Sequence, residues 1–239
     1  MRWFAAKCPV SPTEQRWIED SMRWFAGEFG EEIVRRPVAL PTPEFFPGEY
    51  TGTEADVRRV VGSLAVRFGV HPARLEVEFF DDDLNAGLMA SLPAFAGSWG
   101  GAAGHYQPRG DRAVISINRA EAGNPTSLVA TVAHELGHVL LLGDGRIAPE
   151  RRDSEPLTDL LTVYFGFGVF GANAAFEFSA DNGGWQSRRT GYLTEPMFGY
   201  ALARYAVLRG EPDPDWDRHL DTNPRTYLRK SLRYLGRAG

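Results

Sequence analysis

The sequence predicts an α+β fold, because candidate elements follow one another as helix, strand, hairpin and then a series of helices. Two observations carry this prediction: most of the expected helices open with recognisable capping residues, and the expected strands are gathered in the middle of the chain. The 239 residues are 43% hydrophobic and 24% charged, an ordinary globular composition that excludes a disordered or collagen-like chain.

The first part of the chain contains two helices with N-terminal caps. Ser11 begins the sequence SPTE, which predicts a capping box and an amphipathic helix that continues to Phe29. A Pro-rich stretch, residues 37–48, is typical of an extended arm and is a candidate boundary. After this arm, Thr53 can cap a second helix, whose apolar residues recur at helical spacing until Gly69.

Strands are expected after the second helix. Residues 75–80 predict one strand, and two further runs, 98–107 and 112–118, flank the turn sequence PRGD. Because the second run is rich in β-branched residues, we interpret the pair as a β-hairpin. The first run contains three glycines, at which another backbone segment can approach closely or a bulge can form: Gly100, Gly101 and Gly104.

The later part of the chain is predicted to be mainly helical. Asn124, followed by proline, opens a helix that is expected to run to about Leu142. Another helix is expected to start near Ser154. Two more are expected, one over residues 195–208 and one that is opened by Asn223 and the proline after it.

Composition limits the classes of function. With 26 Lys and Arg against 31 Asp and Glu, the formal net charge is −5, so no nucleic-acid partner is expected. The N-terminus lacks the apolar stretch of a signal peptide, and the longest uncharged stretch, residues 160–176, is interrupted by glycines. We therefore expect a cytoplasmic protein without stable membrane insertion. The single cysteine, Cys8, excludes a Cys-rich zinc site, so a metal would need His and carboxylate ligands.

The sequence HELGH, residues 134–138, lies inside the helix that follows Asn124. The spacing of four places His134 and His138 one turn apart on the same face, where both imidazoles can bind one zinc ion. Glu135 lies about 100° around the helix from His134, where it can accept a proton from a metal-activated water without binding the metal. The alternative interpretation is a pair of core histidines with satisfied hydrogen bonds.

A catalytic zinc site usually needs a third protein ligand. Glu155 begins the next expected helix, and Asp159 follows one turn later on the same face. We expect Glu155 to bind the metal and Asp159 to accept the outer N–H of a zinc-binding histidine, which would fix its tautomer. The alternative is an acid-rich helix N-terminus, which the helix dipole favours by itself.

HELGH followed by EPLTD at residues 155–159 resembles the HExxH…ExxxD arrangement of gluzincins, the thermolysin-like zinc peptidases, over 26 residues. The resemblance implies that His134, His138 and Glu155 hold one Zn²⁺, that Glu135 is the general base and that Asp159 supports a ligand. Only sixteen residues separate His138 from Glu155, a short spacer for such enzymes, and the rest of the chain does not resemble thermolysin. AHELGH after a hairpin, together with a helix that contains EPLTDLL, is similar to bacterial chains of unassigned function. AVISIN followed by AHELGH also resembles the repressor-cleaving zinc proteases of bacteria, which typically have a different third-ligand context.

The resemblance implies a zincin-like core, with a small mixed sheet, an edge hairpin, the HExxH helix and the helix of Glu155, and with extra helices at both ends. Residues 1–50 would form an N-terminal helix and arm, 51–180 the catalytic core and 181–239 a helical region packed on it. In zincins the strand before the metal helix borders the cleft and pairs with extended substrate, so residues 112–118 are expected there.

Thermolysin-like enzymes also place a His and a Tyr over the zinc, where they stabilise the oxyanion. Tyr192 is the catalytic candidate for that role here, because a loop residue can overhang a cleft. Further candidates, each with a purely structural role as the alternative, are His105, Tyr164, Arg188 and His219.

The sequence therefore predicts a zinc-dependent hydrolase, a metallopeptidase that cleaves a peptide or protein substrate with Glu135 as general base. The alternative is a zinc-containing interaction or regulatory module with little or no peptidase activity.

Overall fold

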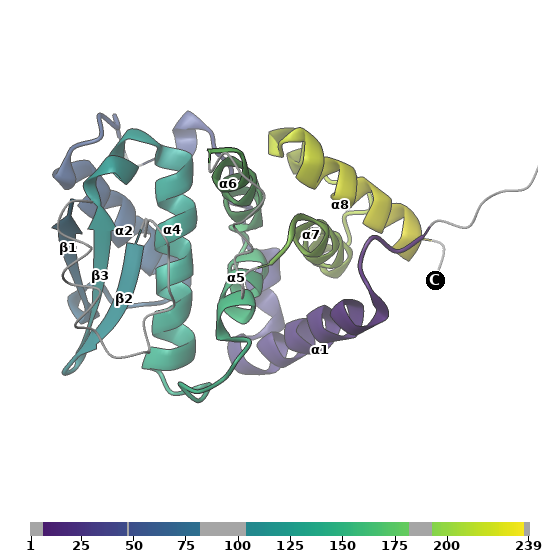
Figure 1. Ribbon diagram of the computed structural model, residues 1–239, viewed down its shortest axis with the longest axis horizontal. Helices are drawn as coiled ribbons and strands as arrows, with labels where there is room; N and C mark the ends of the chain where they lie inside the picture. The colour runs from purple at the N-terminus through teal and green to yellow at the C-terminus, as the bar shows by residue number, and fades with distance from the viewer. Residues whose placement is uncertain (1–6, 47, 82–103, 182–192, 237–239) are drawn as a thin grey trace, which may run out of the picture. The chain divides into compact units, whose positions relative to one another are not determined.

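The computed structural model of the chain describes residues 7–46, 48–81, 104–181 and 193–236. Its contacts divide the chain into two compact units (Figure 1). Met1–Pro41 and Asp159–Gly239 form the helical unit, and Thr42–Thr158 form the sheet unit. The described residues contain seven α-helices and a three-stranded mixed sheet, which confirms the α+β class. The division at residues 50 and 180 stays a prediction.

The sheet has the strand order β1-β3-β2. β1 (Leu75–Phe80) runs parallel to β3 (Arg112–Asn118), and β2 (Gly104–Arg109) runs antiparallel to β3, with Gly104 opposite Ile117. β2 and β3 form the hairpin that the turn sequence predicts. The start of the expected first run, residues 98–103 with two of its glycines, lies outside the described residues: Gly100 and Gly101.

The central position of β3 corrects one expectation. The sequence places residues 112–118 at the cleft as the strand that pairs with substrate, but β3 is hydrogen-bonded to a neighbour on each side. Val114 and Ile115, which point to opposite faces of the sheet, are both fully buried, so β3 is also covered on both faces. Among the described strands, β1 and β2 form the two edges of the sheet.

Two helices of the sheet unit begin at the predicted caps. In α2 (Glu54–Phe68), the side chains of Thr53 and Asp56 each accept a hydrogen bond from the other residue's backbone N–H. α4 (Pro125–His138) begins after Asn124, whose side chain accepts the N–H of Ser127. These local hydrogen bonds explain why the sequence predicts both helix starts correctly.

α4 lies alongside the sheet (Figure 1) and contacts β2 and α2. Beyond His138 it widens into a π-helical turn, η5 (Val139–Gly143), so the helical stretch ends close to the predicted end. Gly104 allows β2 to pack on α4, because a Cβ there would lie 2.5 Å from Cγ2 of Thr131. The sequence analysis expects a backbone segment or a bulge at this glycine, whereas the group that approaches from α4 is the side chain of Thr131.

One described helical stretch, Pro125–Gly143, is long and apolar enough to cross a membrane by length and composition alone. Its apolar window is 78% buried inside the protein, and Leu128, Val132 and Leu136 are fully buried. A buried core helix has the same length and composition, so this stretch is only a weak indication of a membrane span.

The helical unit contains α1 (Pro12–Phe29), α6 (Gly168–Asp181), α7 (Glu195–Arg209) and α8 (Thr222–Leu235). α7 packs against the other three of these helices (Figure 1). α5 (Ser154–Tyr164) begins in the sheet unit, and its later residues belong to the helical unit.

The capping box that is predicted for α1 is present, with reciprocal hydrogen bonds between Ser11 and Glu14. α8 begins two residues earlier than Asn223 and its proline predict. The reason is that Asp221 takes the cap position: its carbonyl accepts the N–H of Arg225, and its own N–H donates to the side chain of Asn173.

Candidate metal centre

The structure brings together the two histidines of α4 and the first acidic residue of α5. Nε2 of His134 lies 3.1 Å from Oε2 of Glu155, and Nε2 of His138 lies 3.5 Å from the same oxygen. The three ligand atoms all lie within 4.8 Å of one another. The imidazole rings stand nearly perpendicular, at 83°, with their centroids 4.7 Å apart. His134, His138 and Glu155 therefore form one cluster of potential metal ligands.

The residue types of the cluster and its two shortest distances match those of zinc sites. In a tetrahedral site with zinc bonds of roughly 2.0–2.2 Å, two ligand atoms are about 3.3 Å apart, and the two distances from Glu155 lie on either side of that value. Two imidazoles and one glutamate also make up the ligand set of a well-known class of catalytic zinc sites. With three protein ligands, a fourth position remains for water or substrate.

The surroundings of the cluster favour an ionised Glu155. His134 is 3% exposed, His138 is 7% exposed, and the side chain of Glu155 is 20% exposed. Burial by itself raises the pKa of the Glu155 carboxyl, but when the imidazoles of His134 and His138 are protonated, their hydrogen bonds and positive charges hold that pKa well below its usual range. Glu155 can therefore supply negative charge to a cation without losing a proton first.

Thr158 contacts the outer nitrogen of His138, with Oγ1 lying 3.4 Å from Nδ1. The threonine hydroxyl donates its hydrogen to the carbonyl of Ser154 at 2.8 Å, so it can only accept from His138. The proton of a neutral His138 therefore belongs on Nδ1, and Nε2 is left unprotonated on the side of Glu155. Thr158 is not among the residues that the sequence predicts for the site, although its spacing of three from Glu155 places it near the same helix face.

Tyr106 of β2 stacks on His138, with ring centroids 6.1 Å apart and an interplanar angle of 28°. Its hydroxyl lies near Gly143, because a Cβ on that glycine would be 3.0 Å from the oxygen. The ring of Tyr106 is therefore a neighbour of the potential metal ligand His138. The sequence analysis missed Tyr106 as well, since only the strand register reveals which face of β2 meets α4.

Glu135, the expected base, is 1% exposed. Within the described residues its carboxylate makes no hydrogen bond or ion pair. A Cβ on Gly104 would lie 3.6 Å from Cγ of Glu135, so the backbone of β2 passes close to this side chain.

Asp159 stands one turn after Glu155 on α5. Its Oδ2 accepts a hydrogen bond from the backbone N–H of Leu193 at 3.1 Å. The bond that the sequence analysis expects from a zinc-binding histidine to Asp159 stays a prediction.

The five candidates for oxyanion stabilisation lie in different parts of the chain. Tyr192 and Arg188 lie outside the described residues. In β2, Gly104 and Tyr106 face α4, so the alternation of the strand turns His105 to the opposite face. Two further candidates belong to the helical unit and have other partners: the Tyr164 hydroxyl donates to Gly30, and Nε2 of His219 accepts from Arg218.

No protein-family model matches this chain, and no curated protein or solved structure is detectably similar to it. Its function therefore has to be argued from the chemistry and arrangement of the side chains themselves.

Proposed function

We propose that the protein is a zinc metallopeptidase with a zincin-like core, which hydrolyses a peptide bond in a peptide or protein substrate. The observation that carries the proposal is the convergence of His134, His138 and Glu155, with Glu135 on the same helix as the two histidines. These three residues would leave one position on the metal for water. The buried carboxylate of Glu135, the residue that follows His134, can serve as a base.

A zinc ion bound by these residues would lower the pKa of a water to about 7 and polarise the substrate carbonyl. The carboxylate of Glu135 accepts a proton from the attacking water and passes it to the leaving amine. Thr158 keeps Nε2 of His138 unprotonated, and the ring of Tyr106 restricts the imidazole from one face. The closeness of β2 to Glu135 limits the access of other waters to the base.

We place an extended substrate along β2. This strand is an edge of the described sheet, and extended peptides add to the edges of sheets through backbone hydrogen bonds. The face of β2 that carries Gly104 and Tyr106 meets α4, so a peptide along this edge would run close to the helix that holds Glu135.

Metal analysis tests the proposed site directly. Protein purified from zinc-supplied cells should contain close to one zinc per chain, and His134→Ala should lose it. Protein without an appreciable amount of transition metal would overturn the proposal.

A base variant tests the reaction. Glu135→Gln removes the proton acceptor without removing a ligand, so it should keep zinc and lower the turnover of a cleaved peptide by about 10²–10⁴-fold. Unchanged turnover would exclude Glu135 as the base.

The second candidate function is a zinc-containing interaction or regulatory module. It is favoured by the positions of the described oxyanion candidates, because His105 faces away from α4 while Tyr164 and His219 bond elsewhere. In that case the protein would bind zinc, His134→Ala would weaken the fold, and a diverse peptide library would remain uncleaved.

A further inference from the structure

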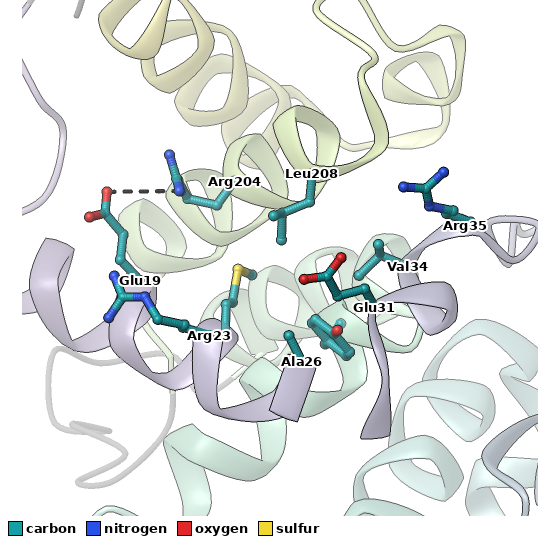
Figure 2. Close-up of a pocket in the computed structure, with 10 residues that line it drawn as sticks. Glu19, Arg23, Ala26, Glu31, Val34, Arg35, Arg204 and Leu208 are labelled. Atoms are coloured by element: carbon teal, nitrogen blue, oxygen red, sulfur yellow. Dashed lines mark ion pairs between the residues drawn. The ribbon is translucent and has the colours of Figure 1, made fainter. Parts of the chain in front are cut away.

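The helical unit contains a cavity of about 230 Å³ (Figure 2). Part of its lining is apolar: Met22 and Ala26 come from α1, Val34 from η1 (Glu31–Arg35) and Leu208 from α7. The ring of Tyr164 adds to this part. Since drug-sized ligands occupy pockets of roughly 300–1,000 Å³, a ligand of this cavity must be smaller.

Arg204 stands on one side of the cavity, next to Glu19 (Figure 2). Its Nε lies 3.8 Å from Oε1 of Glu19, too far for a hydrogen bond, while the same oxygen accepts the hydroxyl of Tyr200 at 2.6 Å. Within the described chain, the Arg204 guanidinium makes no other ion pair and no hydrogen bond. Arg204 is only 29% exposed, so its N–H groups are suited to binding an anionic acceptor in the cavity.

A carboxylate stands on the other side. Figure 2 shows Glu31 between Leu208, Val34 and Ala26, well separated from Arg204. Glu31 forms no ion pair or hydrogen bond with the described residues, and Arg35 lies at the outer margin of the group. The lining therefore offers the N–H groups of Arg204, beside the carboxylate of Glu19, on one side and the exposed carboxylate of Glu31 on the other, with apolar surface between them. Arg23, which also lines the cavity, is paired with Asp20.

We propose that this cavity binds a short apolar peptide with free termini, of about dipeptide size. The C-terminal carboxylate meets Arg204, the N-terminal ammonium meets Glu31, and an apolar side chain contacts Met22 and Leu208. In a free amino acid the ammonium and the carboxylate are both attached to the α-carbon, so these two groups cannot lie on opposite sides of the apolar surface. The proposal does not depend on the metal site, because every lining residue belongs to the helical unit.

Binding can be followed in the full-length chain through the methyl group of Met22, which is 3% exposed and lines the cavity. With methyl-labelled methionine, the dipeptide Ala-Leu should shift the Met22 signal saturably, while Met197, which does not line the cavity, reports non-specific effects.

Four probe molecules distinguish the contributions of the ammonium, the carboxylate and the length of the ligand: Ala-Leu, its N-acetyl derivative, its C-terminal amide and free leucine. We expect Ala-Leu to bind at least about tenfold more tightly than each of the others, the factor expected when a charge-assisted hydrogen bond is lost.

Two variants assign the ends of the ligand. Arg204→Gln should weaken binding of Ala-Leu about tenfold, so that this variant binds Ala-Leu and its C-terminal amide with equal affinity. The same variant should still bind Ala-Leu more tightly than the N-acetyl form. Glu31→Gln should show the reverse pattern. Arg16→Gln, the matched control, removes an arginine from α1 that does not line the cavity, and should bind like the wild type.

A third variant tests the place of binding without changing charge. Ala26→Leu fills the cavity and should abolish the Met22 shift. The proposal is overturned if Ala-Leu causes no saturable shift of Met22, if leucine or a blocked peptide binds as tightly, or if Arg204→Gln and Glu31→Gln bind like Arg16→Gln.

Discussion

At the scale of single residues, one hydroxyl group determines which nitrogen of His138 is available to a metal. Thr158 donates to the carbonyl of Ser154, so only its lone pairs face Nδ1 of His138. Partners of this kind fix the tautomer of a histidine ligand and contribute to metal affinity without touching the ion.

Replacement of Thr158 by valine preserves the shape of the side chain and removes the acceptor. We expect Thr158→Val to weaken zinc binding by about tenfold, the lower end of the range for such outer partners. A competition titration with a chromophoric chelator measures this change. Thr158→Ser keeps the hydroxyl and should remain close to the wild type. If both variants bind zinc like the wild type, the hydroxyl does not position His138.

Tyr164 gives a second prediction at this scale. Burial raises the pKa of Tyr164 to about 12, the charges of Glu31 and Glu32 add to this effect, and the hydroxyl donates to the carbonyl of Gly30. An unfolded tyrosine titrates near pH 10. Because the pKa is higher in the folded state, the contribution of Tyr164 to stability is complete below pH 10 and is lost as the pH rises through about 12.

We therefore expect Tyr164→Phe to lower the free energy of unfolding at pH 7 by about 1 kcal/mol, through the lost hydrogen bond. The same variant should lose less stability than the wild type between pH 10 and 12. Urea unfolding across this pH range measures both effects. An unchanged alkaline profile would show that another group controls it.

The residues of the site differ in how far the sequence can reveal them. His134 and His138 are found by their spacing on one helix, and Glu155 by its place at the start of the next. Thr158 and Tyr106 could not be assigned in the same way, because their contacts with His138 depend on how α5 and β2 pack against α4. Local periodicity reveals the potential ligands, whereas the residues that contact them depend on tertiary packing.

At the scale of elements, a glycine sets the distance between α4 and the start of α5. A Cβ on Gly137 would lie 2.7 Å from Cγ2 of Thr158, the residue that contacts His138. Gly137→Ala should therefore displace Thr158, lower the thermal stability and weaken zinc binding, although no ligand is changed.

Gly62 in α2 is the matched control, because a Cβ there would have no neighbour within 4 Å. Gly62→Ala should raise the free energy of unfolding by about 0.5–1 kcal/mol through helix propensity, and it should leave zinc affinity unchanged. Calorimetry and the chelator titration measure both variants. Gly137→Ala with the zinc affinity of the wild type would show that the close approach of the two helices is not needed at the site.

Helices and strands could be predicted where the sequence pattern that defines them involves only residues close together in the chain. Helix starts follow from caps such as Ser11, Thr53 and Asn124, whose hydrogen bonds reach only three residues along the chain. The central position of β3 was not predicted, because it depends on the parallel pairing of β1 with a strand more than thirty residues later in the chain. Only the pairing reveals that β1 and β2 form the edges of the described sheet.

At the scale of the whole molecule, the helical unit is built from two separate segments of the chain, whereas the sheet unit is one continuous segment. Residues Met1–Pro41 join Asp159–Gly239, and one reason is that α1 packs against α7. The sequence shows that α1 has an apolar face, but it does not show which helix covers that face. The potential metal ligands, by contrast, all lie within the sheet unit, Thr42–Thr158.

This placement predicts where a metal stabilises the molecule. Because the ligands come from α4 and the first turn of α5, zinc should bind the folded sheet unit and not the unfolded chain. Free zinc at 100 times its Kd should then raise the free energy of unfolding by about 2.7 kcal/mol. Hydrogen exchange should slow in α4 and in residues 154–158, and a chelator should reverse both effects. His134→Ala should show neither, whereas an equal stabilisation of that variant would place the bound ion elsewhere.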